Sequence, residues 1–250
     1  MRQAADTTGT PADPGKEHFL KNLLLIHIPH SSLYIPEEYR RTSLISRAEL
    51  DEENLFMCDT GVRELVPEAL IGNELIFPYS RLYCDVERFR DGWEPMDAYG
   101  MGYIYTRDSR GREIFRPDIS HRAEVDLIYE AHHRQLNERV SAILGEYGRC
   151  LIIDLHSYSD EAVRRIFGYT GCPDVCIGLD EGSLPPESSG FSEFDRRALV
   201  QGIKNTFRGL GLSTMINYPY KGSIMPNRFF GKKESGIVSI MLEINKRVLR

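Results

Sequence analysis

The sequence predicts an α/β fold: a single domain with a twisted, mainly parallel or mixed sheet flanked by helices. Short apolar runs rich in β-branched residues alternate with segments of helical periodicity along the chain. The longest helical segment, residues 120–146, is followed at once by the apolar run at residues 150–155. A helix that leads directly into a buried strand is typical of the crossover connections of α/β proteins. The length of 250 residues suits one large domain.

Each element has its own signal in the sequence. Residues 22–28 form an apolar run that ends in a polar break, so we expect a buried strand there. The helix at residues 120–146 begins with a serine, has apolar residues at helical spacing and is followed by glycine. The other predicted helices are residues 36–39, 47–57 and 192–208, and the other predicted strands are residues 74–77, 82–86, 166–169, 175–178, 212–217 and 236–244, with a hairpin at 103–115.

The composition argues against several classes of partner. The net charge of -6 and the pI of about 5.7 are unfavourable for nucleic acid, because phosphate binding needs a basic surface. No apolar run approaches the roughly 20 residues needed to span a membrane. Residues 1–18 lack the apolar core of a signal peptide and are predicted to form a mobile tail, which leaves residues 19–250 as the domain. The five cysteines are an odd number without a CxxC pair, as is typical of reduced thiols, so we expect a cytoplasmic protein.

The run at residues 150–160 (CLIIDLHSYSD) begins as a buried strand and ends in polar side chains. Asp154 and His156 are two positions apart, so on a strand they point to the same side. The carboxyl ends of strands are where α/β proteins place their ligands. We therefore expect His156 to bind a metal ion and other polar clusters to converge on it.

Two of these clusters contain His30 and Glu243, each at the end of a predicted strand. A hydrolytic zinc site needs about three nitrogen or oxygen ligands, an open position for water and a carboxylate near that water as general base. Two histidines, one acidic ligand and a further glutamate would supply this set. His27 lies three residues before His30 and would face the opposite side of a strand, so we interpret His27 as a core or interface histidine.

These residues belong to six short motifs that resemble, in content and order, those of the N-formylglutamate amidohydrolase family. The motifs span residues 24–250, nearly the whole chain. A more distant similarity to zinc carboxypeptidases is visible in HSYS at residues 156–159 and LEI at 242–244. The six motifs are PHSS with IP at residues 29–36, DTGV at 59–62, SRLYCDVERF at 80–89, DLHS at 154–157, NYPYKG at 217–222 and LEIN at 242–245.

The resemblance implies a carboxypeptidase-like (phosphorylase/hydrolase-like) fold and a site for Zn²⁺ or another divalent metal. It implies His30 and His156 as metal ligands and Glu243 as the general base. The H-x-x-E motif of carboxypeptidases has no counterpart after His30, and we choose Asp59 as the acidic ligand. Asp85 is its rival, and a helix N-cap is the alternative role for Asp59. Asp85 and Asp154 are otherwise expected to orient the histidine ligands.

Three cations are candidates for substrate binding. Arg81 and Arg88 could hold a substrate carboxylate through two hydrogen bonds each. Ion pairs with neighbouring acidic residues are the alternative for both arginines. Lys221, in a loop rich in Gly and Pro, is the third candidate. Glu87 stands where the family usually has asparagine, so the substrate-binding end is expected to differ.

The function predicted from these residues is metal-dependent hydrolysis of an amide in a small acidic N-acyl amino acid. The resemblance implies N-formylglutamate as that small-molecule partner, with formate and glutamate as products. One alternative is a carboxypeptidase-like zinc peptidase, which needs an open cleft and one carboxylate anchor. A non-catalytic small-molecule-binding relative is the other alternative, and a broken ligand set would mark it.

Overall fold

The computed structural model describes residues 21–90, 92–116, 119–180, 193–230 and 236–249. Within these residues, six strands form one sheet in the order β2-β1-β3-β6-β4-β5. All neighbouring strands are parallel except β4 and β6, which are antiparallel. This confirms the predicted α/β class with a mainly parallel, mixed sheet. The strands are β1 (Leu24–Ile28), β2 (Glu74–Ile76), β3 (Cys150–Tyr158), β4 (Val175–Gly178), β5 (Thr214–Ile216) and β6 (Ile237–Asn245).

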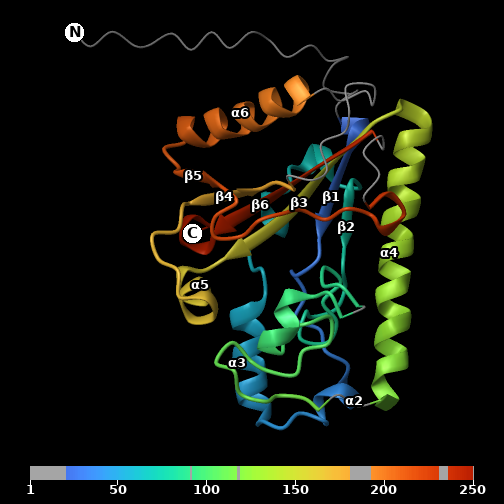
Figure 1. The fold of residues 1–250 in the computed structure, drawn as a ribbon, viewed down its shortest axis with the longest axis vertical. Helices are drawn as coiled ribbons and strands as arrows, with labels where there is room; N and C mark the ends of the chain where they lie inside the picture. Colours follow the sequence, from blue (N-terminus) through green and yellow to red (C-terminus); the bar gives the residue numbers. More distant parts are fainter. Residues whose placement is uncertain (1–20, 91, 117–118, 181–192, 231–235, 250) are drawn as a thin grey trace.

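The helices lie around this sheet and below it (Figure 1). The long helix α4 runs along one side of the molecule, from the sheet down to α2. The segment between β2 and α4 lies below the sheet with α2 and α3, and α6 lies at the opposite side from α4. The helices are α2 (Glu37–Arg40), α3 (Arg47–Met57), α4 (Ile119–Tyr147), α5 (Asp160–Phe167) and α6 (Glu193–Gly209). None of the helices in the described ranges has the length and apolar character needed to cross a bilayer.

The two faces of the sheet have separate apolar cores. On one face, Leu25 and Ile152 pack with Leu136 and Val140 of α4. On the other face, Ile26, Leu155 and Ile240 are among the residues that pack near Val200 of α6. Successive residues of a strand point to opposite faces, so His27, Asp154 and His156 lie on the same face as Leu25 and Ile152. The strand periodicity therefore fixes which side of the sheet receives the polar residues.

Helix α3 brings a further polar segment to the sheet. A capping box holds its start, because Ser46 Oγ accepts a hydrogen bond from the Glu49 N–H while the Glu49 carboxylate accepts one from the Ser46 N–H. The helix ends at Met57, and the N–H of Asp59 donates to the His30 carbonyl at 2.9 Å. This bond joins the segment after α3 to the segment after β1.

Three predicted strand elements are wrong. Residues 82–86 form a turn in which Ser80 accepts the N–H groups of Leu82, Tyr83 and Cys84, and these three side chains are fully buried instead of alternating. In place of the hairpin at 103–115 there are two isolated bridges.

Residues 166 and 167 are the last two of α5, which Ser159 caps, and Gly168 ends the helix with a positive φ. The expected tail at residues 1–18 lies outside the described residues.

Replacing Ile152 by alanine should lower the free energy of unfolding by about 2–5 kcal/mol, because this fully buried side chain would leave a cavity between β3 and α4. Urea unfolding followed by circular dichroism measures the loss. Leu127→Ala, at an exposed position of α4, is the control and should change stability by less than about 0.5 kcal/mol. Equal losses in the two variants would contradict this account of the core.

Candidate functional site

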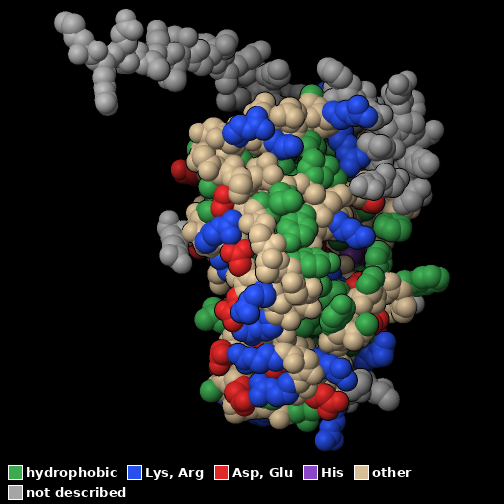
Figure 2. Space-filling model, turned by 60° about the vertical axis from the view of Figure 1, so that its left-hand side comes forward, with side chains coloured by type: hydrophobic (Ala, Val, Ile, Leu, Met, Phe, Trp, Pro, Cys, Tyr) green, Lys and Arg blue, Asp and Glu red, His purple; other side chains and the backbone are tan. Residues whose placement is uncertain are grey.

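A cavity of about 490 Å³ opens at the carboxyl ends of β1, β3 and β6. On the face shown in Figure 2, a histidine side chain is visible inside a hollow of the surface. Apart from Asp85, every residue predicted to form the site lines the cavity: His30, Asp59, Arg81, Arg88, Asp154, His156, Lys221 and Glu243. Residues more than 200 positions apart in the sequence thus meet at one place.

The register of the parallel strands sets the arrangement of the central residues. His27 of β1 pairs with Asp154 of β3, and His156 of β3 pairs with Glu243 of β6. Paired residues on neighbouring strands lie about 5 Å apart and point to the same face. Four polar side chains therefore form a compact group on the α4 face of the sheet, with His30 just beyond the end of β1.

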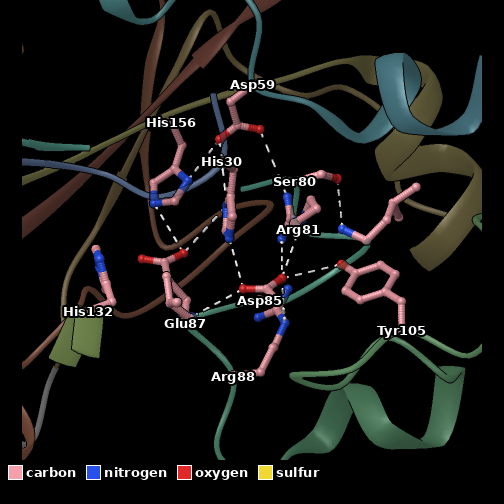
Figure 3. A network of polar contacts seen from close by, with 12 residues as sticks. His30, Asp59, Ser80, Arg81, Asp85, Glu87, Arg88, Tyr105, His132 and His156 are labelled. Atoms are coloured by element: carbon pink, nitrogen blue, oxygen red, sulfur yellow. Dashed lines mark hydrogen bonds and ion pairs between the residues drawn. The ribbon is translucent and has the colours of Figure 1, made fainter. Parts of the chain in front are cut away.

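His30, Asp59 and His156 converge on one point (Figure 3). Their nearest ligating atoms all lie within 4.8 Å of one another. Asp59 Oδ2 is 2.9 Å from His156 Nδ1 and 3.8 Å from His30 Nδ1. Asp59 does not cap a helix; it faces the two histidines. All three side chains are buried.

This group fits a divalent metal ion on structural grounds. Ligand atoms bound at about 2.0–2.2 Å to one ion lie roughly 3–3.5 Å apart, close to the separations found here. The Nδ1 atom of His30 is buried without a hydrogen-bond partner, a costly state that a ligand or cation would relieve. The other ring nitrogen of His30, Nε2, contacts Asp85 Oδ1 at 2.8 Å. A carboxylate of this kind commonly orients a metal-binding histidine.

Asp85 is the centre of a buried ion network. Arg81 Nη2 lies 2.9 Å and Arg88 Nε 3.6 Å from Asp85 Oδ2, and the Tyr105 hydroxyl donates to the same oxygen. Burial alone would raise the pKa of Asp85, but His30 and the two guanidinium groups lower it well below its usual value. Both arginines thus form the ion pairs considered as their alternative role. Arg88 also lines the cavity, and its Nε is too far from Asp85 for a hydrogen bond.

Glu87 lies among His30, Asp59 and His156, a position that the sequence did not predict. One of its oxygens, Oε2, is 3.7 Å from His30 Nδ1 and 3.4 Å from His156 Nε2. Burial lowers the pKa of His156, but the Glu87 and Asp154 carboxylates raise it well above its usual value. In the metal-free chain, a proton on His156 therefore supplies part of the positive charge that the carboxylates require. The only sequence signal for this role was the departure from asparagine at position 87.

Glu243 lies beside this group as a buried carboxylate. Burial raises its pKa to about 8; the nearby His156 lowers it, and Asp59 raises it. Its Oε2 atom has no hydrogen-bond partner. A carboxylate with these properties, next to a metal-binding group, can accept a proton from water.

The loop with the NYPYKG motif closes one wall of the cavity. Asn217 Oδ1 accepts the Leu179 N–H, which ties the loop to the end of β4. The same loop also approaches Gly178 closely. A Cβ atom at this position would lie 2.3 Å from the Gly222 carbonyl oxygen, so only glycine fits there. Lys221 is exposed at the rim.

Lys246 also lines the cavity, although it was not among the residues predicted to form the site. Its Nζ donates to the Cys58 carbonyl at 2.6 Å, next to Asp59. A lysine that follows a strand by one residue carries no pattern that would distinguish it from a surface charge.

Comparisons with known proteins bear on this chain in three ways. No curated protein matches it significantly. Among solved structures, an N-formylglutamate amidohydrolase from Ralstonia eutropha JMP134 is similar with a TM-score of 0.71 and 20% identity, over 90% of this chain and 82% of the other. A gene product from Agrobacterium tumefaciens is similar with a TM-score of 0.63 and 17% identity, over 91% of this chain and 82% of the other. At these identities the similarity shows the fold.

The sequence itself carries the family assignment. The model of the N-formylglutamate amidohydrolase family matches residues 23–250, nearly the whole chain and all the elements that form the cavity. The motifs around His30, His156 and Glu243 lie within this match. The chain therefore belongs to the N-formylglutamate amidohydrolase family of hydrolases.

Proposed function

We propose that this protein is a metal-dependent amide hydrolase that acts on a small acidic N-acyl amino acid. N-Formylglutamate, cleaved to formate and glutamate, is the first candidate substrate. The convergence of His30, Asp59 and His156 beside the buried Glu243 carries this proposal. An intact set of this kind is unfavourable for a non-catalytic binding protein, which has no need for a buried unpaired carboxylate.

In this proposal His30, Asp59 and His156 hold Zn²⁺ or another divalent ion. Such an ion polarises a carbonyl and lowers the pKa of bound water. Asp85 orients the ring of His30 through Nε2. Asp154 lies 3.1 Å from His156 Nε2 and orients the ring of His156 in the same way. Glu243 takes the proton of the attacking water and passes it to the leaving amine.

The cationic side chains account for recognition of an acidic substrate. Arg88 lines the cavity and lies farther from Asp85 than Arg81 does, so it is the better candidate to bind a substrate carboxylate. Arg81 interacts with both Asp59 and Asp85, so it lies nearer the reacting bond and can stabilise negative charge there. Lys221 supplies a further positive charge at the rim.

The cellular location proposed is the cytoplasm. All five cysteines are free and buried. Reduced, buried thiols suit a compartment in which disulfides do not persist.

Purified protein should contain a divalent metal, and His156→Ala should lose it, because the variant removes one of three ligands. Elemental analysis of the desalted protein measures the metal content. His121→Ala is the matched control, since His121 packs against Tyr39 away from the cavity. A wild-type protein that binds no divalent ion after incubation with Zn²⁺ would contradict the hydrolase mechanism.

Glu243→Gln should retain the metal but lower kcat for N-formylglutamate by about 10²–10⁴-fold, because the amide cannot accept the water proton. A base works only when deprotonated, so the activity of the wild type should rise with pH through the Glu243 pKa. Burial places that pKa at about 8 in the metal-free chain, and a bound cation lowers it, so the acid limb should lie below pH 8.

Steady-state kinetics between pH 5 and 9 test this assignment. The residual activity of Glu243→Gln should lack the acid limb. Full activity in this variant would remove Glu243 from the mechanism. Parallel assays with N-acetylglutamate and with dipeptides separate the amidohydrolase from the peptidase.

Arg88→Gln should raise KM for N-formylglutamate by about 10–100-fold, the loss expected for a charge-assisted hydrogen bond of roughly 1.5–3 kcal/mol. Arg90→Gln is the control, because Arg90 pairs with Asp126 and Glu130 outside the cavity. The variant should also discriminate less than the wild type between the substrate and its monoamide. An unchanged KM would place the carboxylate elsewhere, with Lys221 as the next candidate.

A further inference from the structure

A second group of ligating side chains lies directly beside the first. His27, Glu87 and Asp154 offer ligating atoms that all lie within 4.8 Å of one another. His27 Nδ1 is 2.8 Å from Asp154 Oδ1 and 3.7 Å from Glu87 Oε1. These separations are close to those of atoms that share one ion in protein sites.

The side chains of His27 and Asp154, and the backbone that carries Glu87, are held in place independently of any ligand. His27 and Asp154 are register partners on β1 and β3, and Asp154 Oδ2 accepts the Ile224 N–H at 3.0 Å. Helix α4 holds the backbone on both sides of Glu87: His133 Nε2 contacts the Val86 carbonyl, and the Tyr129 hydroxyl donates to the Arg88 carbonyl. The group is therefore preorganised, as a metal site requires.

Lysine and arginine side chains do not compensate the negative charge of this group, and a proton on His156 balances only part of it. Among the described residues, no lysine or arginine forms an ion pair with Glu87 or Asp154, whose side chains are 14% and 2% exposed. Arg81 and Arg88 instead interact with Asp59 and Asp85. Two neighbouring carboxylates at this burial need a nearby cation.

The ring of His156 provides a separate indication of a ligand. Its Nε2 atom is buried and lies 3.1 Å from Asp154 Oδ1 and 3.4 Å from Glu87 Oε2. On the other side of the group, His27 Nε2 lies 2.9 Å from His132 Nε2. In this structure His27 Nδ1 donates to Asp154 Oδ1, so its Nε2 accepts from His132. A cation bound by Nδ1 would take the place of that proton, and Nε2 would then donate to His132.

We propose that His27, Glu87 and Asp154 bind a second divalent ion, and that Glu87 bridges it to the ion held by His30, Asp59 and His156. The two oxygens of Glu87 face the two groups, Oε1 toward His27 and Oε2 toward His30 and His156. A set of one imidazole and two carboxylates suits Zn²⁺ or Mn²⁺. The bridging role rests on the proposed function, whereas the second site by itself does not.

The number of ions bound per chain tests this inference. Metal-free protein is titrated with Zn²⁺ and with Mn²⁺, and bound metal is measured by elemental analysis after desalting. The wild type should saturate at two ions per chain, and His27→Gln and Glu87→Asn at one. His121→Gln, the matched control, should bind two. Circular dichroism of each variant reports its folding.

Each result separates the second site from the first. Saturation of the wild type at one ion overturns the second site and leaves the proposed function intact, whereas no binding at all overturns both. Two ions in His27→Gln also overturn this assignment. If His27→Gln fails to fold, the wild-type titration still decides, supported by the electron paramagnetic resonance of the Mn²⁺ form. Two bridged Mn²⁺ ions about 3.5–4 Å apart should be spin-coupled, and isolated signals only would contradict the bridge.

Discussion

The register of β1, β3 and β6 is the constraint on which the site depends. It places His27 beside Asp154 and His156 beside Glu243, all on the face covered by α4. A shift of one residue in any of these strands would turn its polar side chains to the opposite, apolar face and bury them near α6 without partners. The apolar packing of Leu25, Ile152 and Ile237 on the α4 face therefore also secures the geometry of the polar group.

Charge compensation shapes the rest of the cavity. The strands and the segment after α3 supply carboxylates, and the segment between β2 and α4 adds two arginines with Asp85 and Glu87. Arg81 and Arg88 interact mainly with Asp85, so their charge is largely used where His30 is oriented. The remaining carboxylates depend on histidine protons or on metal ions for neutrality. The cavity thus combines a cluster of carboxylates with two arginines, and the proposed function uses the first for a metal ion and the second for an acidic substrate.

The sequence predicted the sheet, the main helices and eight of the residues that line the cavity, because these follow from apolar periodicity and from motifs at strand ends. It did not predict the structure of residues 82–86 correctly. Their apolar side chains are typical of a strand, yet hydrogen bonds to Ser80 stabilise a turn. Apolar residues are buried in every direction around this turn, so its sequence does not show the alternation of buried and exposed residues that marks a strand at a surface. His27 illustrates another limit. Its place on β1 was predicted, but contact with His132 depends on how α4 packs across the sheet, which no local pattern encodes.

Glu87 shows how a single side chain changes the character of such a site. An asparagine at this position would offer one oxygen and no charge, so it could face a substrate carboxylate without repulsion. A carboxylate here repels an acidic group and attracts cations. Because α4 fixes the backbone at Val86 and Arg88, Glu87 cannot withdraw from the histidines by a simple movement of the loop. We therefore expect the carboxylate of the proposed substrate to bind on the Arg88 side, because Glu87 makes the space beside the histidines favourable for cations.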